Sequence, residues 1–530
     1  MLEEKITTSS IFKSFMLAGL SGLLLAASFP YFNCPLLAYF AFIPLFVILK
    51  EERSFLRGFL LGFISGIVFW TITIYWLIHV TLLGTMLLIP YLAFYTALFS
   101  LAVVLWGKTN NPQRINIPFV LFSAAVWVIL EYLRSHLLTG FPWALVGFSQ
   151  YQMLPIVQLA TTTGVWGVSF FVILVNGFLF LAFNYWKYKK NLTNVFSPLI
   201  ICLVCVIGVL VFGWFNMKLL KDTFVSSRKT ITVAVIQGNI PQELKWQNSY
   251  LDMILEKHLH LSLIASEKKP ILIIWPEASV PTVVQDKPQY LEKIKNFCRR
   301  NRVWLLVGAV QRKGENFFNS ALLISPEGVL VGEYDKNHLV PFGEYVPLRN
   351  IFKFLDTIVP IGEMTKGKEL NVLKIFLEGP VHPVSLHFGV LICFEDLFSE
   401  LARGLVLKKA EFLVNITNDA WYKKTSAAEQ HLQASVFRAI ENRIWLVRSA
   451  NTGVSAFIEP SGKIHRFTDK NRQSLFVEGI QVNSFPLRKS TPTFYVRFGD
   501  WFIGLCVLII LGCGLLNNKR GYFLHNKRKI

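Results

Sequence analysis

Residues 384–396 read VSLHFGVLICFED, and this stretch decides the fold of the polar half of the chain. Its β-branched and aromatic residues predict a strand over residues 384–392, which ends at Cys393. The run from Gly389 to Ile392 is continuously apolar, and such runs are typical of strands covered on both faces, as in layered α/β domains. We therefore expect a buried strand with a thiol at its exit.

The same pattern recurs on both sides of this stretch. A helical spacing of leucine and isoleucine over residues 249–265 separates the first two predicted strands. Ser325-Pro326-Glu327-Gly328 and Glu459-Pro460-Ser461-Gly462 are turn sequences, which adds antiparallel hairpins. Further strands are expected at about residues 231–237, 271–275, 304–310, 321–324, 411–416 and 445–449. Residues 222–497 are thus predicted to form one α/β domain, long enough to bury its own core.

The rest of the chain is more apolar than a soluble protein. Of the 530 residues, 53% are hydrophobic and only 16% are charged, against roughly 25% charged residues in soluble domains. This composition excludes a disordered, collagenous or plain cytosolic protein. A membrane-spanning helix needs about 20 apolar residues. Runs almost free of charged residues predict eight spans, at about residues 12–29, 35–50, 58–80, 86–107, 117–133, 160–186, 197–217 and 500–517.

The basic residues indicate the orientation of these spans. Short cytoplasmic loops collect Lys and Arg, and with the N-terminus inside, the short outer loops hold only Arg134. Much of the net charge of +20 therefore comes from basic residues in the predicted cytoplasmic loops, and nucleic acid is not an expected partner. The same orientation places residues 222–497 outside, between a bundle of seven spans (1–221) and a final span with a basic cytoplasmic tail (498–530). The first span lacks a convincing cleavage site and is expected to be retained.

Two further features concern the loops and the cysteines. Gly140-Phe141-Pro142-Trp143 breaks the helical pattern and predicts an outer or re-entrant loop. This loop either lines a lipid path or belongs to the interfacial aromatic belt. The seven cysteines are too scattered for a disulfide framework, and their spacing does not favour a zinc site. We expect no metal and no cofactor.

Three predicted strands outside the membrane lead to reactive residues. Glu277 follows the run ending at Pro276, Lys336 lies in a loop containing Pro and Gly, and Cys393 ends its strand. Their separations of 59 and 57 residues each fit about one supersecondary unit, so we expect three neighbouring strands to bring them together. A carboxylate can take the proton of a thiol, and an ammonium can stabilise an oxyanion. Together they suffice for acyl transfer through a covalent intermediate, whereas each alone more often has a structural role.

Trp275-Pro276-Glu277, Lys336 and Cys393-Phe394-Glu395 resemble the Glu-Lys-Cys signature of the nitrilase (carbon–nitrogen hydrolase) superfamily. Three more motifs are similar to those of the apolipoprotein N-acyltransferase family: QGNIPQELKW at 237–246, KNHLVPFGE at 336–344 and NDAW at 418–421. The resemblance covers nearly the full length. It implies a helical bundle of eight spans and one extracytoplasmic nitrilase-like αββα sandwich.

The resemblance also implies an activity. Cys393 takes the sn-1 acyl chain of a phospholipid, of the phosphatidylethanolamine type, as a thioester. The chain then passes to the amine of diacylglyceryl-cysteine at the start of an apolipoprotein. Glu277 acts as the general base and Lys336 stabilises the oxyanion. The supporting residues are Glu344, Glu395, Phe394 and, on a mobile loop near the acyl chain, Trp246.

These roles imply a setting. We expect the bacterial cytoplasmic (inner) membrane, with the catalytic domain on the periplasmic side and both termini in the cytoplasm. The expected partners are membrane lipid, including the phospholipid donor, and the diacylated apolipoprotein acceptor. A monomer is sufficient, because the two bulky substrates can be handled in turn.

Two positions depart from the family pattern. Many members have Tyr after the nucleophile where this chain has Phe394, and the family commonly continues Phe-Gly after NDAW where this chain has Tyr422-Lys423-Lys424. Several polar residues nearby are expected to be structural: His338 and His431 in packing or loop hydrogen bonds, Arg438 with Glu441 in an i,i+3 ion pair, and Asn451-Thr452-Gly453 in a turn near the site.

Two alternative functions remain at the level of sequence. A membrane-tethered amidohydrolase would use the same three residues, with water resolving the thioester. A transporter or receptor would use the outer domain only to bind a ligand. The predicted spans hold almost no ionisable residue at mid-depth, where transport paths place them, and this disfavours the transporter.

Overall fold

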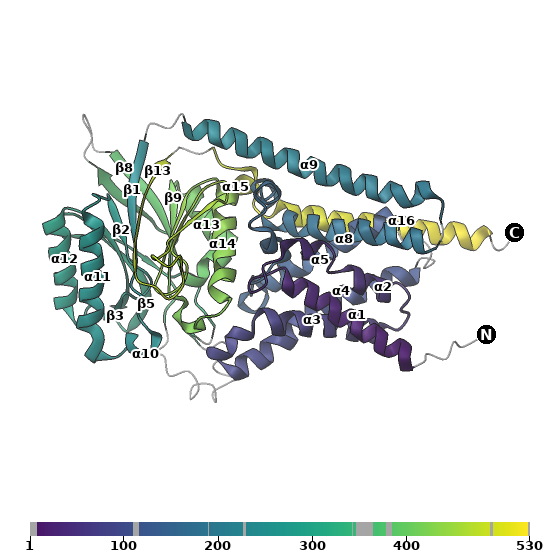
Figure 1. The fold of residues 1–530 in the computed structure, drawn as a ribbon, viewed down its shortest axis with the longest axis horizontal. Helices are drawn as coiled ribbons and strands as arrows, with labels where there is room; N and C mark the ends of the chain where they lie inside the picture. Colours follow the sequence, from purple (N-terminus) through teal and green to yellow (C-terminus); the bar gives the residue numbers. More distant parts are fainter. Residues whose placement is uncertain are drawn as a thin grey trace. The chain divides into compact units, whose positions relative to one another are not determined.

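The computed structural model describes residues 8–109, 116–188, 190–225, 229–341, 343–345, 364–377, 384–487 and 491–527. The chain divides into two compact units, one of Met1–Phe215 with Asp500–Ile530 and one of Asn216–Gly499. The first unit is helical, and the second holds the strands that the structure describes (Figure 1). The first unit is built from packed helices, and the second from layered sheets and helices.

The helical unit consists of long apolar helices joined by short ones. The long helices are α1 (Thr8–Ala27), α3 (Phe55–Thr73), α4 (Leu82–Thr109), α5 (Ile117–His136), α8 (Val165–Lys187), α9 (Leu192–Val225), whose end belongs to the second unit, and α16 (Trp501–Lys527). The short ones are η1 (Pro35–Tyr39), α2 (Ile43–Leu49), η2 (Tyr75–His79), η3 (Leu137–Thr139), η4 (Val146–Gln150), α6 (Leu154–Val157) and α7 (Ala160–Thr163).

Five helices in the described part of the chain are long and apolar enough to cross a membrane. They are Phe55–Thr73, Leu82–Gly107, Ile117–Thr139, Val165–Lys187 and Leu192–Asp222. The other three expected spans fall on shorter apolar helices, Ile11–Ala27, Pro35–Leu49 and Trp501–Leu516. The structure therefore supports a helical region with five candidate spans, and the count of eight stays a prediction.

Turns explain why some expected spans are shorter than their apolar runs. The run at 35–50 divides into η1 and α2, and Pro44 lies at the start of α2, where a missing backbone N–H costs nothing. The run at 160–186 divides at Gly164, whose φ of +65° ends α7 before α8 begins. Apolarity alone does not reveal such breaks, because the turn residues between the helices are apolar too.

Small residues allow α3 and α4 to pack closely. Gly58, Gly62 and Gly66 lie one turn apart on α3. A Cβ on Gly66 would lie 2.7 Å from the Cα of Ala93, and one on Gly62 would lie 2.3 Å from the Oγ of Ser100. Helices in lipid associate through such close contacts rather than through the hydrophobic effect.

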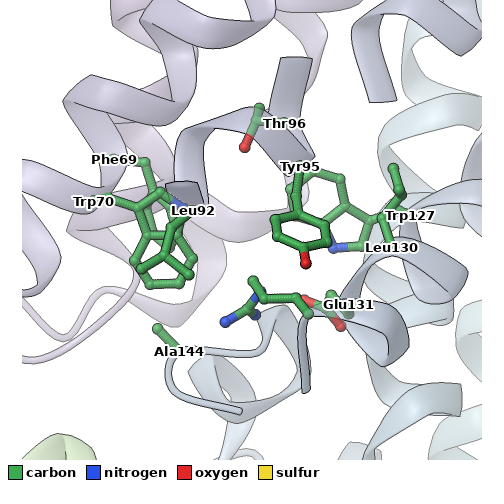
Figure 2. Close-up of a pocket in the computed structure, with 10 residues that line it drawn as sticks. Phe69, Trp70, Leu92, Tyr95, Thr96, Trp127, Leu130, Glu131 and Ala144 are labelled. Carbon is green, nitrogen blue, oxygen red and sulfur yellow. The ribbon is translucent and has the colours of Figure 1, made fainter. Parts of the chain in front are cut away.

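A pair of buried charged residues on α5 holds the aromatic loop. Nη1 of Arg134 donates to the carbonyl oxygens of Phe141 at 2.7 Å and Trp143 at 2.8 Å. Oε1 of Glu131 accepts from the backbone N–H of Val146 at 2.7 Å. Trp143 is fully buried, unlike a belt residue at an interface. A pocket beside the pair is lined by Phe69, Trp70, Leu92, Tyr95, Thr96, Trp127, Leu130 and Ala144 (Figure 2).

The second unit contains two sheets. The first has the strand order β13-β1-β2-β4-β5-β6, with β3 paired to β4, and the second has the order β12-β11-β10-β9-β8-β7. The strands of the first sheet are β1 (Lys229–Gln237), β2 (Leu272–Ile274), β3 (Val280–Val283), β4 (Trp304–Lys313), β5 (Asn316–Ile324), β6 (Leu330–Asp335) and β13 (Gly479–Leu487). Those of the second are β7 (Val372–Leu377), β8 (Val384–Ile392), β9 (Phe412–Thr417), β10 (Leu446–Ala450), β11 (Ala456–Ile458) and β12 (Ile464–Arg466).

Helices cover the outer faces of the two sheets (Figure 1). The long ones are α11 (Leu251–Ser266) and α12 (Pro288–Asn301) on the first sheet, and α13 (Ser399–Leu407) and α14 (Ala427–Asn442) on the second. Short helices are α10 (Gln242–Lys245), η5 (Asn248–Tyr250), η7 (Cys393–Leu397), η8 (Asp419–Tyr422) and α15 (Phe494–Phe498). One core joins the sheets through residues such as Val235, Phe388 and Val414. A second core joins the first sheet to α11 and α12.

The layers explain the sequence pattern. β9 and β10 are buried along their whole length, as their continuous apolar runs predict. The predicted turns connect antiparallel pairs, β5 with β6 at residues 325–328 and β11 with β12 at residues 459–462. Gly328 and Gly462 have φ values of +70° and +92°, which only glycine adopts without strain. The polar half of the chain is therefore an α/β domain, as its sequence predicts.

Candidate active site

The predicted trio comes from both sheets. β2 runs parallel to β4, β5 antiparallel to β4, and β6 antiparallel to β5, so β2 and β6 end at the same edge. Glu277 follows β2 and Lys336 follows β6 at that edge, whereas Cys393 follows β8 in the second sheet. The expectation of three neighbouring strands is therefore wrong. Face-to-face sheets lie about 10 Å apart, a distance that side chains from both can bridge.

Glu277 is held by a turn pressed against β4. A Cβ on Gly308 of β4 would lie 2.4 Å from the carbonyl oxygen of Pro276, so only glycine leaves room for this turn. Oε1 of Glu277 accepts a hydrogen bond from Nδ2 of Asn319 at 2.8 Å and lies 3.5 Å from Nζ of Lys336. Nζ of the buried Lys245 donates to the backbone carbonyl of Glu277 at 2.9 Å. The carboxylate thus has a fixed position.

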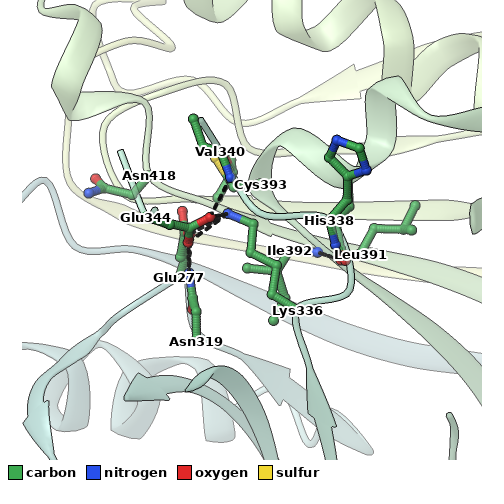
Figure 3. Close-up of polar contacts among 12 residues, drawn as sticks. Glu277, Asn319, Lys336, His338, Val340, Glu344, Leu391, Ile392, Cys393 and Asn418 are labelled. Atoms are coloured by element: carbon green, nitrogen blue, oxygen red, sulfur yellow. Dashed lines mark hydrogen bonds and ion pairs between the residues drawn. The ribbon is translucent and has the colours of Figure 1, made fainter. Parts of the chain in front are cut away.

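Lys336 lies between two carboxylates. Its Nζ is 2.9 Å from Oε2 and 3.0 Å from Oε1 of Glu344, in addition to its contact with Glu277 (Figure 3). Asn319 bridges the same acids, since its Nδ2 also donates to Oε1 of Glu344 at 2.8 Å. Oε2 of Glu344 accepts in turn from the backbone N–H of Val340 at 2.8 Å. Both oxygens of Glu344 are therefore engaged in holding the lysine and its loop.

Cys393 lies at a strained turn between β8 and η7. Its φ is +53°, a region that residues with a Cβ rarely adopt. Its carbonyl oxygen accepts from Nδ2 of Asn415 at 3.2 Å. Strain of this kind persists only where surrounding contacts enforce it. Figure 3 shows Cys393 beside Glu277, Lys336 and Glu344.

Glu395 joins this turn to the loop of Lys336. Its carboxylate accepts from the backbone N–H groups of Ile392 at 2.7 Å, Asn337 at 2.5 Å and His338 at 3.0 Å. The hydroxyl of Tyr334 donates to the same carboxylate at 3.0 Å. Burial raises the pKa of Glu395 to about 7, although these backbone hydrogen bonds oppose the shift. With its oxygens engaged in this way, Glu395 ties the loop of Lys336 to the turn of Cys393.

The charges around Cys393 set its resting state. Burial, and next the negative charge of Glu277, raise the pKa of the Cys393 thiol, while Lys336 partly opposes the rise. Burial by itself would lower the pKa of Lys336, but the charges of Glu344 and Glu277 outweigh it and raise this pKa. The site therefore rests as a thiol beside an ammonium group. A base would have to remove the thiol proton before the sulfur could react as a thiolate.

The other predicted site residues lie around this centre. Phe394 is buried, with its ring 5.3 Å from that of Phe398 and 6.2 Å from that of His338, so hydrocarbon fills this position. Trp246 follows α10 and is 48% exposed. Its exposed indole does not belong to the buried cluster, and its contribution to the site remains a prediction.

Two structural expectations are confirmed. Nη2 of Arg438 donates to Oε1 of Glu441 at 2.9 Å, which is the predicted i,i+3 pair within α14. Asn451 lies at a bend and donates to the carbonyl oxygen of Ile240 at 2.8 Å and to Oδ1 of Asn418 at 2.9 Å. It thereby ties the QGNI and NDAW motifs together behind the site.

Sequence reasoning missed Asn319 and gave no role to Lys245. Asn319 is a buried polar residue of β5, next to the buried Ser320, and buried polar residues are the informative exceptions in a strand. Burial lowers the pKa of Lys245 to about 8, opposed by the charges of Glu277 and Cys393. Tyr422, one of the departures noted above, also lies near these charges: burial, and next the charge of Cys393, raise the pKa of its phenol.

Comparison with known proteins identifies the family of this chain. Residues 21–178 match the family model of the apolipoprotein N-acyltransferase N-terminal domain, and residues 232–485 match that of carbon-nitrogen hydrolases. An apolipoprotein N-acyltransferase from Geobacter metallireducens is 36% identical over 514 residues, which cover 93% of each chain. This chain belongs to the apolipoprotein N-acyltransferase family. Apolipoprotein N-acyltransferase 2 from Treponema denticola is 30% identical over 89% of each chain.

Membership in the N-acyltransferase family has direct consequences. The chain is an acyltransferase, and its apolar helices and relatives indicate a bacterial membrane protein. The enzyme class implies lipid and lipoprotein substrates.

Among solved structures, a cysteine-to-alanine mutant of the Nesterenkonia AN1 amidase from the nitrilase superfamily is similar to this chain. The two are 15% identical, with a TM-score of 0.38 over 52% of this chain and 95% of the amidase chain.

Proposed function

We propose that this acyltransferase takes the sn-1 acyl chain of a phospholipid, of the phosphatidylethanolamine type, as a thioester on Cys393. The chain then passes to the α-amine of diacylglyceryl-cysteine in an apolipoprotein. The observation that carries this proposal is the convergence of Glu277, Lys336 and Glu344 beside a strained, buried Cys393. A nucleophile, a base and a fixed positive charge are the parts that acyl transfer through a covalent intermediate needs.

Glu277 is the base in the first step. Its contacts with Asn319 and Lys336 are both made by Oε1, so we assign Oε2 to accept the proton of Cys393. As the proton leaves, the sulfur attacks the ester carbonyl of the lipid and a tetrahedral oxyanion forms. The bond to the sn-1 oxygen then breaks, Glu277 returns the proton to that oxygen, and a lysophospholipid leaves. Cys393 is left as a thioester.

Lys336 supplies the positive charge for both tetrahedral intermediates. Its raised pKa keeps it an ammonium group at neutral pH, so it stabilises negative charge and does not act as a base. Glu344 has both oxygens engaged with Lys336, Asn319 and Val340, and its role is to hold the lysine in place. Glu395 is assigned a positioning role through the backbone of Ile392 and Asn337.

In the second step Glu277 again takes up one proton and gives it back. The amine of the diacylated cysteine loses a proton to Glu277 as its nitrogen attacks the thioester. The carbon–sulfur bond breaks, and the proton returns from Glu277 to the sulfur of Cys393. The product is an amide, and the free thiol is restored. The exposed indole of Trp246 is assigned to contact with an acyl chain.

The proposal includes the setting of the reaction. We propose eight spans, with residues 1–221 and 498–530 in and around the membrane and residues 222–497 on the periplasmic side of the inner membrane. Both termini are in the cytoplasm, and the enzyme works as a monomer. The distribution of Lys and Arg among the short loops supports this orientation.

The test is mass spectrometry of the detergent-purified protein after incubation with phosphatidylethanolamine. We expect an acyl adduct on the peptide containing Cys393 that hydroxylamine removes, together with one lysophospholipid per adduct. Adding a diacylated lipopeptide should discharge the adduct and leave the lipopeptide heavier by that acyl chain. A Cys393→Ala variant should give neither product, because the sulfur that carries the acyl chain is missing.

Two outcomes would contradict the proposal. Absence of an adduct on folded protein would exclude the phospholipid donor. Release of free fatty acid at the same rate with and without the lipopeptide would mean that water hydrolyses the thioester, as in a hydrolase.

A Cys298→Ala variant is the matched control and should still form the adduct, because Cys298 is a buried thiol of the same domain that lies on α12.

A further inference from the structure

A closed ring of charged side chains lies behind the nucleophilic turn. Nε2 of His431 is 2.8 Å from Oδ1 of Asp396, and Nδ1 is 2.9 Å from Oδ1 of Asp419. Nη1 of Arg448 is 2.9 Å from Oδ2 of Asp396, and Nη2 is 3.2 Å from Oδ2 of Asp419. Each of the four side chains is at most 1% exposed. Nothing in the acyl-transfer chemistry above uses this ring.

The contacts of His431 favour its protonated form. An ionised carboxylate oxygen can only accept a hydrogen bond, so a ring nitrogen that donates to one must carry a proton. Because each nitrogen of His431 meets a carboxylate oxygen, we infer that the side chain is an imidazolium. The ring then holds two positive and two negative charges and is neutral. Nη2 of Arg448 lies 3.0 Å from Nδ1 of His431, and the repulsion between these two groups opposes the charge.

The electrostatics agree with this assignment. Burial by itself would lower the pKa of His431, but the charge of Asp396, followed by that of Asp419, outweighs burial and the charge of Arg448. The resulting pKa is about 9. The pKa values of both Asp396 and Asp419 are lowered: burial alone would raise them, and His431 and Arg448 reverse the effect.

The ring contacts Cys393 at two points. Nε2 of His431 lies 3.3 Å from the carbonyl oxygen of Cys393, whose backbone is in the strained conformation. The hydroxyl of Thr417 donates to Oδ1 of Asp419 at 3.4 Å, and Thr417 acts to lower the pKa of the Cys393 thiol, whereas the charge of Asp419 raises it. Asp396 itself belongs to η7, the turn that Cys393 begins. The charge of the ring therefore acts on the nucleophile through short, buried connections.

We propose that His431 is a positioning residue for the acyl transfer: its imidazolium neutralises Asp396 and Asp419 behind Cys393, so that the nucleophilic turn keeps its shape and the thiol can release its proton. The proposal rests on the proposed function of Cys393. Without this charge the ring carries a net charge of −1, and a thiolate would form beside an uncompensated carboxylate. The groups that face Cys393 from the other elements include Glu277, Lys336, Lys245 and Tyr422.

The test measures how fast iodoacetamide alkylates Cys393 in the full-length protein in detergent, followed by mass spectrometry of its peptide. Alkylation requires the thiolate. One unit charge at ~7 Å with an effective dielectric of ~20 shifts the pKa of a thiol by about 1.7 units, which changes the rate at pH 7.5 about 50-fold. We expect His431→Gln to slow alkylation about 50-fold and Asp419→Asn to speed it about 50-fold. The double variant, whose ring is neutral again, should return to within about threefold of the parent.

The opposite signs separate this role from a merely structural one. Loosening of the fold would expose Cys393 and speed alkylation in every variant, so faster alkylation in folded His431→Gln would overturn the proposal, as would an unchanged rate. If His431→Gln does not fold, Asp419→Asn decides alone, and an unchanged or slower rate overturns the proposal. Glu429→Gln is the matched control, an acid of α14 paired with Arg466 and not with the ring, and should leave the rate within about twofold. This readout needs no lipid, so failure of the ring proposal is distinct from absence of the acyl adduct.

Discussion

Both units of the molecule bury charged side chains, but they pair them differently. In the helical unit, Arg134 donates to the carbonyl oxygens of Phe141 and Trp143, and Glu131 accepts from the N–H of Val146. In the α/β unit, Lys336 contacts Glu277 and Glu344, and the three side chains converge beside Cys393. Buried charge paired with backbone holds the chain in a conformation. Buried charge paired with other ionisable groups changes their pKa values, as it does for Lys336 and Cys393.

The comparison predicts the largest loss of activity for Lys336→Met. Without the ammonium group, Glu277 and Glu344 face each other uncompensated, and the oxyanion loses its stabilising charge. We expect acylation of Cys393 to slow by roughly 10²- to 10³-fold, measured as adduct formation in single turnover. Lys336→Met combined with Glu344→Gln should recover thermal stability but not the rate. Recovery of the rate would show that Lys336 only balances charge.

Arg134→Met tests the other side of the comparison. Two buried carbonyl groups would lose their donor, at a cost of about 1–3 kcal/mol each. The melting temperature in detergent should therefore fall by several degrees. Acylation of Cys393 per folded molecule should stay within about threefold of the parent, because backbone pairing supports structure rather than chemistry. A large loss of acylation without a loss of stability would contradict this distinction.

The charged ring predicts a pH dependence of stability. The pKa of His431 is about 9 in the folded protein, above its ordinary value of 6.5. Because this pKa is raised, protonated His431 contributes to the free energy of unfolding. The contribution is fully present below about pH 6.5 and is lost as the pH rises through about 9. It amounts to about 3 kcal/mol. Melting temperatures between pH 6 and pH 10 should fall for the parent and stay flatter for His431→Gln. Parallel curves for the two proteins would argue against an imidazolium in the ring.

Asn319→Leu should slow acylation less than Lys336→Met. Nδ2 of Asn319 donates to Oε1 of both Glu277 and Glu344, so its removal takes one hydrogen-bond donor from each carboxylate and leaves their contacts with Lys336. One hydrogen bond to a charged group is worth about 1.5–3 kcal/mol, so loss of the bond to Glu277 corresponds to roughly a 10- to 150-fold slower acylation if it is all expressed in the rate. Asn319→Asp, which adds a third carboxylate, should be slower still. Equal rates for the two variants would mean that Asn319 acts through shape rather than through charge.

Much of the fold is predictable from local patterns. Continuous apolar runs located β8, β9 and β10, and the turn sequences at 325–328 and 459–462 located two hairpins. The apolar runs of the helical unit were found as well, but not their interruptions. Gly164 ends α7 with a positive φ, and the segment between η1 and α2 turns without a polar residue to mark it. A pattern based on hydropathy cannot detect a break that is itself apolar.

Local sequence patterns identified the residues that could react, because few predicted strands lead to a thiol, a carboxylate or an amine. The resemblance of the motifs predicted the family, which the relatives confirm. How these residues meet depends on the packing of the two sheets. Two facing sheets, rather than three neighbouring strands, supply Glu277, Lys336 and Cys393. The bridging amide of Asn319 and the ring of Asp396, His431, Asp419 and Arg448 are likewise contacts between distant segments. These contacts form because a buried charge is stable only when an opposite charge or a hydrogen-bond partner lies beside it. That partner can lie far away in the sequence, so the spacing of residues does not predict it.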